Sequence, residues 1–212
     1  NHPVSRFLLS ILLEHDSKKV EVFGLSTGPH QDGMTEIMQG ACEHWLTLNQ
    51  YNDLELARLI ADLRLDVLIE LGGYTGYSRI GTLIHRPAPL QLSYLGYFAP
   101  TYLSCVDGWI GDKELFNGLN EIDKERKLLN IKGGYMAFKP LILPEIKRKK
   151  DQRFRFGCFN NSRKLVKETI ELFCRIINDL PSAQLVLKSI TFIEKDEKER
   201  IRKLFLKEGL NE

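Results

Sequence analysis

The segment LARLIADLRLDVLIELGG, residues 56–73, decides the fold. Its first half repeats apolar residues at the spacing of one helical face: Leu56, Leu59, Ile60 and Leu63. Its second half, residues 66–71, is a short apolar run that ends in Gly72 and Gly73. The pattern predicts a helix that leads into a buried strand, which a glycine turn closes.

The same alternation continues in both directions along the chain. Helical periodicity is found at residues 4–12, 77–85, 165–180 and 194–207. Runs typical of strands are found at residues 19–26, 90–96, 108–112, 127–131, 154–160 and 184–188. Alternating helices and strands predict an α/β fold built on parallel sheets that helices cover.

A basic stretch, IKRKKDQRFR at residues 146–155, interrupts this pattern. It is dense in charge and has no apolar period, which is typical of an exposed connection. We therefore expect a first domain at residues 1–146, a linker at 147–153 and a second domain at 154–212. The second domain has too few strands to close a sheet, so it is expected to be incomplete.

Bulk composition excludes several classes of protein. Of the 212 residues, 43% are hydrophobic and 27% are charged, so a folded globular chain is expected. The net charge of +2 comes from mixed charges, so no global field singles out a nucleic-acid partner. A nucleic-acid contact of the basic linker is an alternative, but the linker has no interleaved aromatic residues for stacking, so no nucleic-acid partner is expected. No apolar run reaches membrane-spanning length, and the four separated cysteines form no CxxC pair, so we expect reduced thiols, no membrane partner and a cytoplasmic location.

The segment NNSRKLVK, residues 160–167, places three cations at the predicted start of the helix 165–180. Cations oppose the helix dipole there, whereas a bound anion would reverse the sign of the effect. Arg163 and Lys164 are therefore candidates for a phosphate contact. The alternative is an exposed helix end with solvated side chains.

Near the amino end, His2 and Pro3 come just before the first predicted helix. Proline favours the first helical position, so His2 would face the positive end of the helix dipole and tend to be neutral. A neutral imidazole can accept a proton or hold a substrate oxygen near pH 7. A plain capping role is the alternative.

Two further strings lie where strands are predicted to end. GGYTG, residues 72–76, would leave Tyr74 at the carboxyl edge of the sheet, the usual ligand crevice of open α/β sheets, although it does not match GxGxxG. RPAPLQLSYLGY, residues 86–97, would leave its strand toward the same edge. A tight turn and rigid packing are the alternatives. No DxD motif occurs, so no metal site is expected.

Taken in order, HPVSRFLL, GGYTG, RPAPLQLSYLGY and FGCFNNSRK resemble the catalytic region of the O-GlcNAc transferase family, over essentially the whole chain. The bacterial, cyanobacterial-type members, in which tetratricopeptide repeats precede this region, are the most similar. The resemblance implies two Rossmann-like domains of a B-type glycosyltransferase, the second one truncated here. It implies metal-independent, inverting transfer from a nucleotide sugar, UDP-GlcNAc or a related donor, to Ser and Thr hydroxyls of proteins, with no cofactor.

The resemblance also implies roles for residues that match the family's motifs. Lys164 matches the lysine that steadies the leaving diphosphate, and Asn161 matches a residue that contacts the donor nucleotide. Arg163 replaces a frequent tyrosine beside them. His2 matches the histidine of an HP motif near donor and acceptor, and Asp32 matches an aspartate near the acceptor.

Tyr74, Leu95 and Gly96 match positions that line the family's sugar pocket. After them the chain departs from the family, because LGYFAPTY, residues 95–102, stands where LGYPGT is common. The sugar is therefore left open between GlcNAc, fucose and another hexose. A catalytically silent scaffold that keeps the fold for interaction is the alternative from another class.

Overall fold

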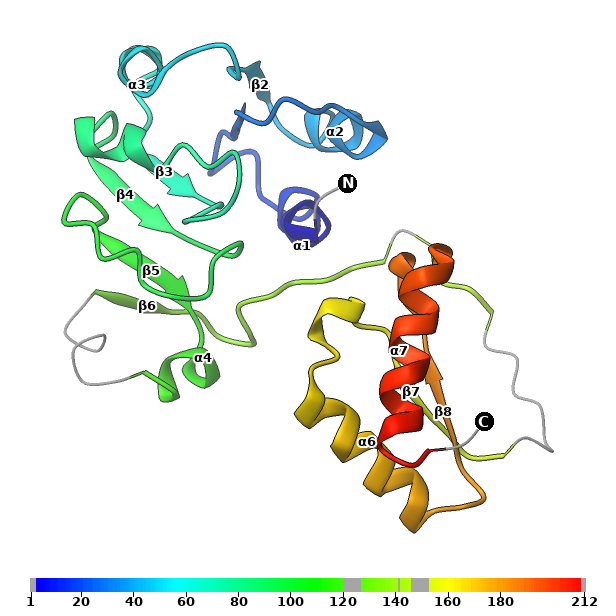
Figure 1. Ribbon diagram of the computed structural model, residues 1–212. Coiled ribbons are helices and arrows are strands. Elements are labelled where there is room, and N and C mark those ends of the chain that lie inside the picture. The colour runs from blue at the N-terminus through cyan, green and yellow to red at the C-terminus, as the bar shows by residue number, and fades with distance from the viewer. Residues whose placement is uncertain (1–2, 120–126, 141, 146–152, 211–212) are drawn as a thin grey trace. The chain divides into compact units, whose positions relative to one another are not determined.

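The computed structural model describes residues 3–119, 127–140, 142–145 and 153–210 (Figure 1). The chain divides into two compact units, unit 1 at Asn1–Leu143 and unit 2 at Pro144–Glu212. The linker predicted at residues 147–153 lies outside the described residues except for Arg153. The boundaries of the three predicted segments stay a prediction.

Unit 1 begins with helix α1 (Pro3–Leu12), strand β1 (Phe23–Ser26), helix α2 (Gly33–Gln39), strand β2 (His44–Thr47) and helix α3 (Asp53–Asp62). Strands β1 and β2 form a parallel two-stranded sheet. Gly24 in β1 lies under the indole of Trp45 in β2, because a Cβ atom there would lie 2.3 Å from the ring. The two strands are therefore packed as well as hydrogen-bonded.

The second sheet of unit 1 has four parallel strands in chain order: β3 (Val67–Glu70), β4 (Leu90–Ser93), β5 (Gly108–Gly111) and β6 (Leu128–Asn130). Figure 1 shows these strands side by side, with colours that run from turquoise at β3 to yellow-green at β6. A 3-10 helix η1 (Ile80–His85) connects β3 to β4, and helix α4 (Lys113–Asn117) follows β5. The predicted α/β alternation is confirmed for the four strands. The helix predicted at residues 77–85 is a 3-10 helix that begins at Ile80, and α4 was not predicted.

Helix α3 joins the two sheets of unit 1 into one core. It begins at a capping box, in which Asn52 and Glu55 each accept the other's backbone N–H, at 2.9 and 3.0 Å. Its buried residues Leu56 and Ile60 contact partly buried leucines of β1, β2 and β3. At 1% and 4% exposure, these two side chains are the inner face that the sequence periodicity predicted.

Buried polar groups hold the start of β4. The Gln91 side chain is fully buried, and its Nε2 donates to the carbonyl oxygens of Leu83 and Cys105 at 2.9 and 2.8 Å. Asp107 accepts the Gln91 backbone N–H at 2.7 Å and pairs with Arg86 at 2.8 Å. These bonds tie η1 and the loop before β5 to the central strand.

Unit 2 consists of strand β7 (Arg155–Cys158), a 3-10 turn η2 (Ser162–Lys164), helix α6 (Lys167–Asp179), strand β8 (Gln184–Leu187), a 3-10 turn η3 (Ile190–Ile193) and helix α7 (Lys195–Lys207). The two strands pair in parallel. Helices α6 and α7 pack against each other around Ile170, Cys174, Ile201 and Phe205 (Figure 1).

Helix α6 begins later than the sequence predicts, at Lys167 rather than at Leu165. Arg163 and Lys164 therefore lie on the separate turn η2 and not in the first turn of the helix. The burial of Ser162 and Leu165 on either side of these cations explains the separation, because both residues turn inward before the helix starts. The predicted crowding of three cations at a helix start is wrong for two of them.

Candidate functional site

The carboxyl ends of β3 and β4 carry two loops that fit into each other without space to spare. A Cβ atom on Gly96 would lie 1.9 Å from the Leu71 carbonyl oxygen, and one on Gly73 would lie 2.3 Å from the Tyr97 side chain. The absence of side chains at both glycines therefore allows the loops to meet. The Tyr74 hydroxyl also donates to the Thr101 carbonyl oxygen.

Glu70, the last residue of β3, fixes the first of these loops. Its two carboxylate oxygens accept the backbone N–H groups of Gly72 and Gly73, both at 2.7 Å. Ser78 Oγ donates to the same carboxylate at 3.4 Å. The polar backbone of the GGYTG turn is thus satisfied by a side chain of its own strand.

Backbone strain is found at this edge, as it is at Arg64 and Arg86, which precede β3 and β4. Tyr77, Leu95 and Tyr102 have φ values of 64°, 68° and 58°, a conformation that non-glycine residues seldom adopt. Such residues persist only where the surrounding structure holds them, and they cluster at functional sites. This edge of unit 1 is consequently a candidate ligand site.

A pocket of about 360 Å³ opens beside these loops. Leu25, Thr27 and Gly28 line it at the carboxyl end of β1, and Leu71 and Gly72 line it at the carboxyl end of β3. It therefore lies between the two sheets at the ends of their strands, where open α/β sheets usually bind ligands. Val4 of α1 also lines the pocket.

Three of the predicted site residues, Tyr74, Leu95 and Gly96, come together at this edge. The Tyr74 side chain packs edge-on against Tyr97, with ring centroids 5.6 Å apart, and Tyr74 is 54% exposed. Leu95 is only 4% exposed, so it presents backbone rather than its side chain to the edge. Their binding roles stay predictions.

The other two predicted residues of unit 1 are placed differently. His2 lies outside the described residues. Asp32 is the N-cap of α2, where its Oδ1 accepts the N–H groups of Met34 and Thr35 at 3.0 and 3.1 Å. The carboxylate has a structural task there, and its role near an acceptor stays a prediction.

Asn161, Arg163 and Lys164 come together in unit 2, on the loop that follows β7. The Asn161 side chain caps η2 by accepting the Arg163 N–H at 3.0 Å. Arg163 and Lys164 are exposed, and within the part of the chain that the structure describes neither forms an ion pair. By contrast, Lys167 three residues later pairs with Glu171 at 3.4 Å.

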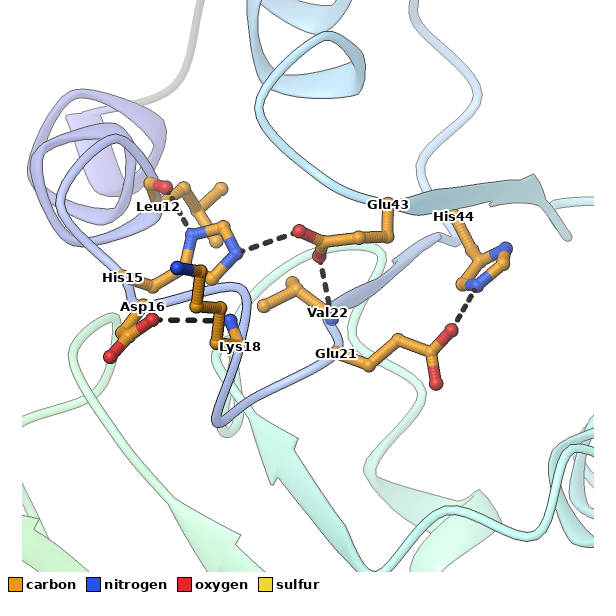
Figure 2. Close-up of polar contacts among 8 residues, drawn as sticks. All are labelled: Leu12, His15, Asp16, Lys18, Glu21, Val22, Glu43 and His44. Carbon is orange, nitrogen blue, oxygen red and sulfur yellow. Dashed lines mark hydrogen bonds and ion pairs between the residues drawn. The ribbon is translucent and has the colours of Figure 1, made fainter.

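Sequence reasoning missed a polar cluster at the opposite, amino ends of β1 and β2 (Figure 2). His15 lies between the Leu12 carbonyl oxygen, 2.5 Å from Nδ1, and Glu43 Oε1, 3.0 Å from Nε2. Glu43 also accepts the Val22 N–H at 2.8 Å. Both ring nitrogens face acceptors, so the imidazolium form satisfies the site best.

The pKa values in this cluster follow from its contacts. The Leu12 carbonyl and the Glu43 carboxylate raise the pKa of His15. The Val22 N–H and His15 lower the pKa of Glu43. Because the cluster lies at the end of the strands away from the pocket, we regard it as a structural clasp between α1 and the first sheet.

The described residues hold neither a metal-binding cluster nor a membrane-spanning helix. Residues 3–119, 127–140, 142–145 and 153–210 contain no group of three or more His, Cys, Asp or Glu side chains arranged to hold a metal ion. In the same residues no helix has the length and apolar character needed to span a bilayer.

The parallel sheets and the loops at their carboxyl ends define a Rossmann-like α/β fold of the B-type glycosyltransferases. A solved structure with this fold is a mutant O-GlcNAc transferase from Thermobaculum terrenum, which is 26% identical in sequence and superposes with a TM-score of 0.89. The match covers 99% of this chain and 40% of the Thermobaculum chain. Residues 1–124 match the family described as Glycosyl transferase family 41. The chain belongs to that family.

Curated relatives agree with this assignment. A probable UDP-N-acetylglucosamine–peptide N-acetylglucosaminyltransferase of Arabidopsis thaliana, SEC, is 27% identical over 88% of this chain. The corresponding enzyme of Caenorhabditis elegans is 34% identical over 53% of this chain. The chain spans 20% and 10% of the lengths of these two relatives. The resemblance to the O-GlcNAc transferase family is confirmed.

Proposed function

We propose that this chain is part of a glycosyltransferase that moves a sugar from a nucleotide-sugar donor to Ser or Thr hydroxyls of proteins. Family membership and the named activities of the relatives support the reaction class. The observation that carries the proposal is the pair of exposed cations, Arg163 and Lys164, on the loop after β7. Charge on a leaving diphosphate would be met by such groups together with backbone N–H donors.

The chemistry is an in-line displacement at the anomeric carbon. The acceptor hydroxyl oxygen forms the new bond to this carbon as the bond to the diphosphate oxygen breaks. The electron pair leaves with the nucleoside diphosphate, and the hydroxyl proton is released to solvent. Lys164 would stabilise the departing charge, with Asn161 and Arg163 beside the donor. Unit 1 would hold the acceptor side, with Tyr74 and the backbone at Leu95 and Gly96 near the sugar.

The full-length protein tests the proposal with Lys164→Ala and a matched control, Lys167→Ala. We expect Lys164→Ala to lower kcat for transfer about 100-fold, as for loss of one transition-state donor. Lys167 is an exposed i,i+4 partner of Glu171, so Lys167→Ala should stay within about twofold. Unchanged transfer in Lys164→Ala would contradict the role given to Lys164, whereas no transfer by the unchanged protein with any donor would favour the catalytically silent scaffold.

The donor and the setting of the protein are finer proposals. The LGYFAPTY segment, which would form the lip of the sugar pocket, departs from the common LGYPGT form, and its Phe98 is 72% exposed. Parallel assays with UDP-GlcNAc, UDP-glucose and GDP-fucose separate the O-GlcNAc transferase from an O-fucosyl- or other hexosyltransferase. We further propose a bacterial, cyanobacterial-type protein with upstream tetratricopeptide repeats and a cytoplasmic location.

A further inference from the structure

The turn η2 is too short to hold its own shape. It has three residues, and its backbone bonds are Lys164 N–H to the Asn161 carbonyl at 3.0 Å and Leu165 N–H to the Ser162 carbonyl at 2.9 Å. Isolated turns of this length are unstable in water. The burial of Ser162 and Leu165, at 1% and 6% exposure, anchors the turn and leaves Arg163 and Lys164 outside.

A chain of hydrogen bonds runs from Thr191 through Ser162 to Glu197. Thr191 Oγ1 in η3 donates to Ser162 Oγ at 2.8 Å, and Ser162 Oγ donates to Glu197 Oε1 in α7 at 2.5 Å. Since the single hydroxyl hydrogen of Thr191 is already used, the 2.8 Å contact between Ser189 and Thr191 has Ser189 as its donor. All the hydrogen bonds therefore point toward the carboxylate.

Glu197 is an ionised acceptor at the end of this chain. Arg200 donates to it twice, through Nε at 2.7 Å and Nη2 at 3.0 Å. These bonds and the one from Ser162 lower the pKa of Glu197 to about 2. The Glu197 carboxylate is thus charged at neutral pH, and its hydrogen bond to the buried Ser162 hydroxyl is charge-assisted.

We propose that Glu197 is a positioning residue which, through Ser162, fixes the turn that presents Lys164 to a diphosphate. The inference rests on the proposed function, because Lys164 is assigned to the diphosphate there. Glu197 touches no substrate in this role. It connects the first turn of α7 to the loop after β7, so that the cations are held by a residue 35 positions away from Ser162.

The test measures the affinity of the full-length protein for UDP and for GDP by calorimetry, a readout that needs no turnover. Glu197→Gln keeps the size of the side chain but removes the charge. Glu199→Gln is the matched control, since it makes the same change two residues later on α7, where Glu199 pairs with Arg202 at 3.9 Å. Denaturant unfolding of both variants checks that the fold is kept.

The sign of the effect separates positioning from simple electrostatics. Loss of a carboxylate near Arg163 and Lys164 would by charge alone tighten diphosphate binding. We expect about fivefold weaker binding in Glu197→Gln, and no further weakening when Glu197→Gln is added to Lys164→Ala. Glu199→Gln should bind like the unchanged protein.

Several outcomes overturn the inference alone. Tighter or unchanged nucleotide binding in Glu197→Gln contradicts the inference. It is also contradicted if Glu197→Gln weakens binding by the same factor in the unchanged protein and in Lys164→Ala. If the unchanged protein binds neither nucleotide and transfers no sugar, the proposed function fails instead.

Discussion

The two candidate edges hold their loops in different ways. In unit 1, the loops after β3 and β4 fit by shape, with Gly96 against the Leu71 carbonyl and Gly73 against Tyr97. In unit 2, the loop after β7 is held by charge, through Ser162, Glu197 and Arg200. The first edge presents closely fitted loops, whereas the second presents the exposed cations Arg163 and Lys164, which are proposed to meet a diphosphate.

The largest loss of stability is expected from adding a side chain at Gly96, where the two loops of unit 1 are in closest contact. Gly96→Ala should destabilise the protein by about 3 kcal/mol, because the new Cβ atom meets backbone that cannot rotate away. Gly76→Ala is the matched control, since nothing lies within 4 Å of a Cβ atom there. Thermal unfolding compares the two, and equal effects would mean that the loops of unit 1 are not held by fit.

The His15 clasp tests whether charge also stabilises a part of unit 1. The folded-state pKa of His15 is raised, so its contribution to stability is complete below the unfolded pKa of about 6.5 and is lost as pH rises through the folded value. Hydrogen exchange at the amides of β1 and β2 should therefore show less protection at pH 8.5 than at pH 6.

Glu43→Gln is the control for that clasp. It removes the carboxylate that faces His15 Nε2, so the change in protection between the two pH values should shrink. A pH dependence that is the same in this variant would show that the contact between His15 and Glu43 is not its source.

The smallest effect is expected at the start of α6. Val166 is the N-cap there, is 52% exposed and makes no side-chain cap bond. Val166→Asn should stabilise α6 by about 1 kcal/mol, because an Asn side chain can accept a free N–H of the first turn. Amide exchange within α6 measures this gain. A loss of protection would mean that η2 does not tolerate a polar neighbour.

Much of the fold followed from the sequence because its signals are local. The apolar period of residues 56–63 and the run 66–71 predicted α3 and β3 to within three residues at each end. The pair α2 and β2 was missed because their residues have a weak apolar period. The cap at Asp32, followed by Thr35, was the signal that could have found α2.

The candidate site was less predictable because its contacts are long-range. The sequence pattern predicted that Tyr74 lies at the end of a strand. It did not predict that Gly96 contacts the carbonyl of Leu71, 25 residues earlier in the chain. Likewise, NNSRKLVK suggested one helix start, whereas the partner that holds Ser162 is Glu197 in α7. Such pairs depend on tertiary packing rather than on spacing.

The positions of the two tryptophans have a practical consequence. Trp45 lies in β2 and Trp109, 3% exposed, in β5, so the chain's entire indole emission comes from unit 1. Far-ultraviolet circular dichroism also records α6 and α7 of unit 2. One denaturant titration followed by both signals will therefore tell whether the chain unfolds as a single cooperative block or in two separate steps.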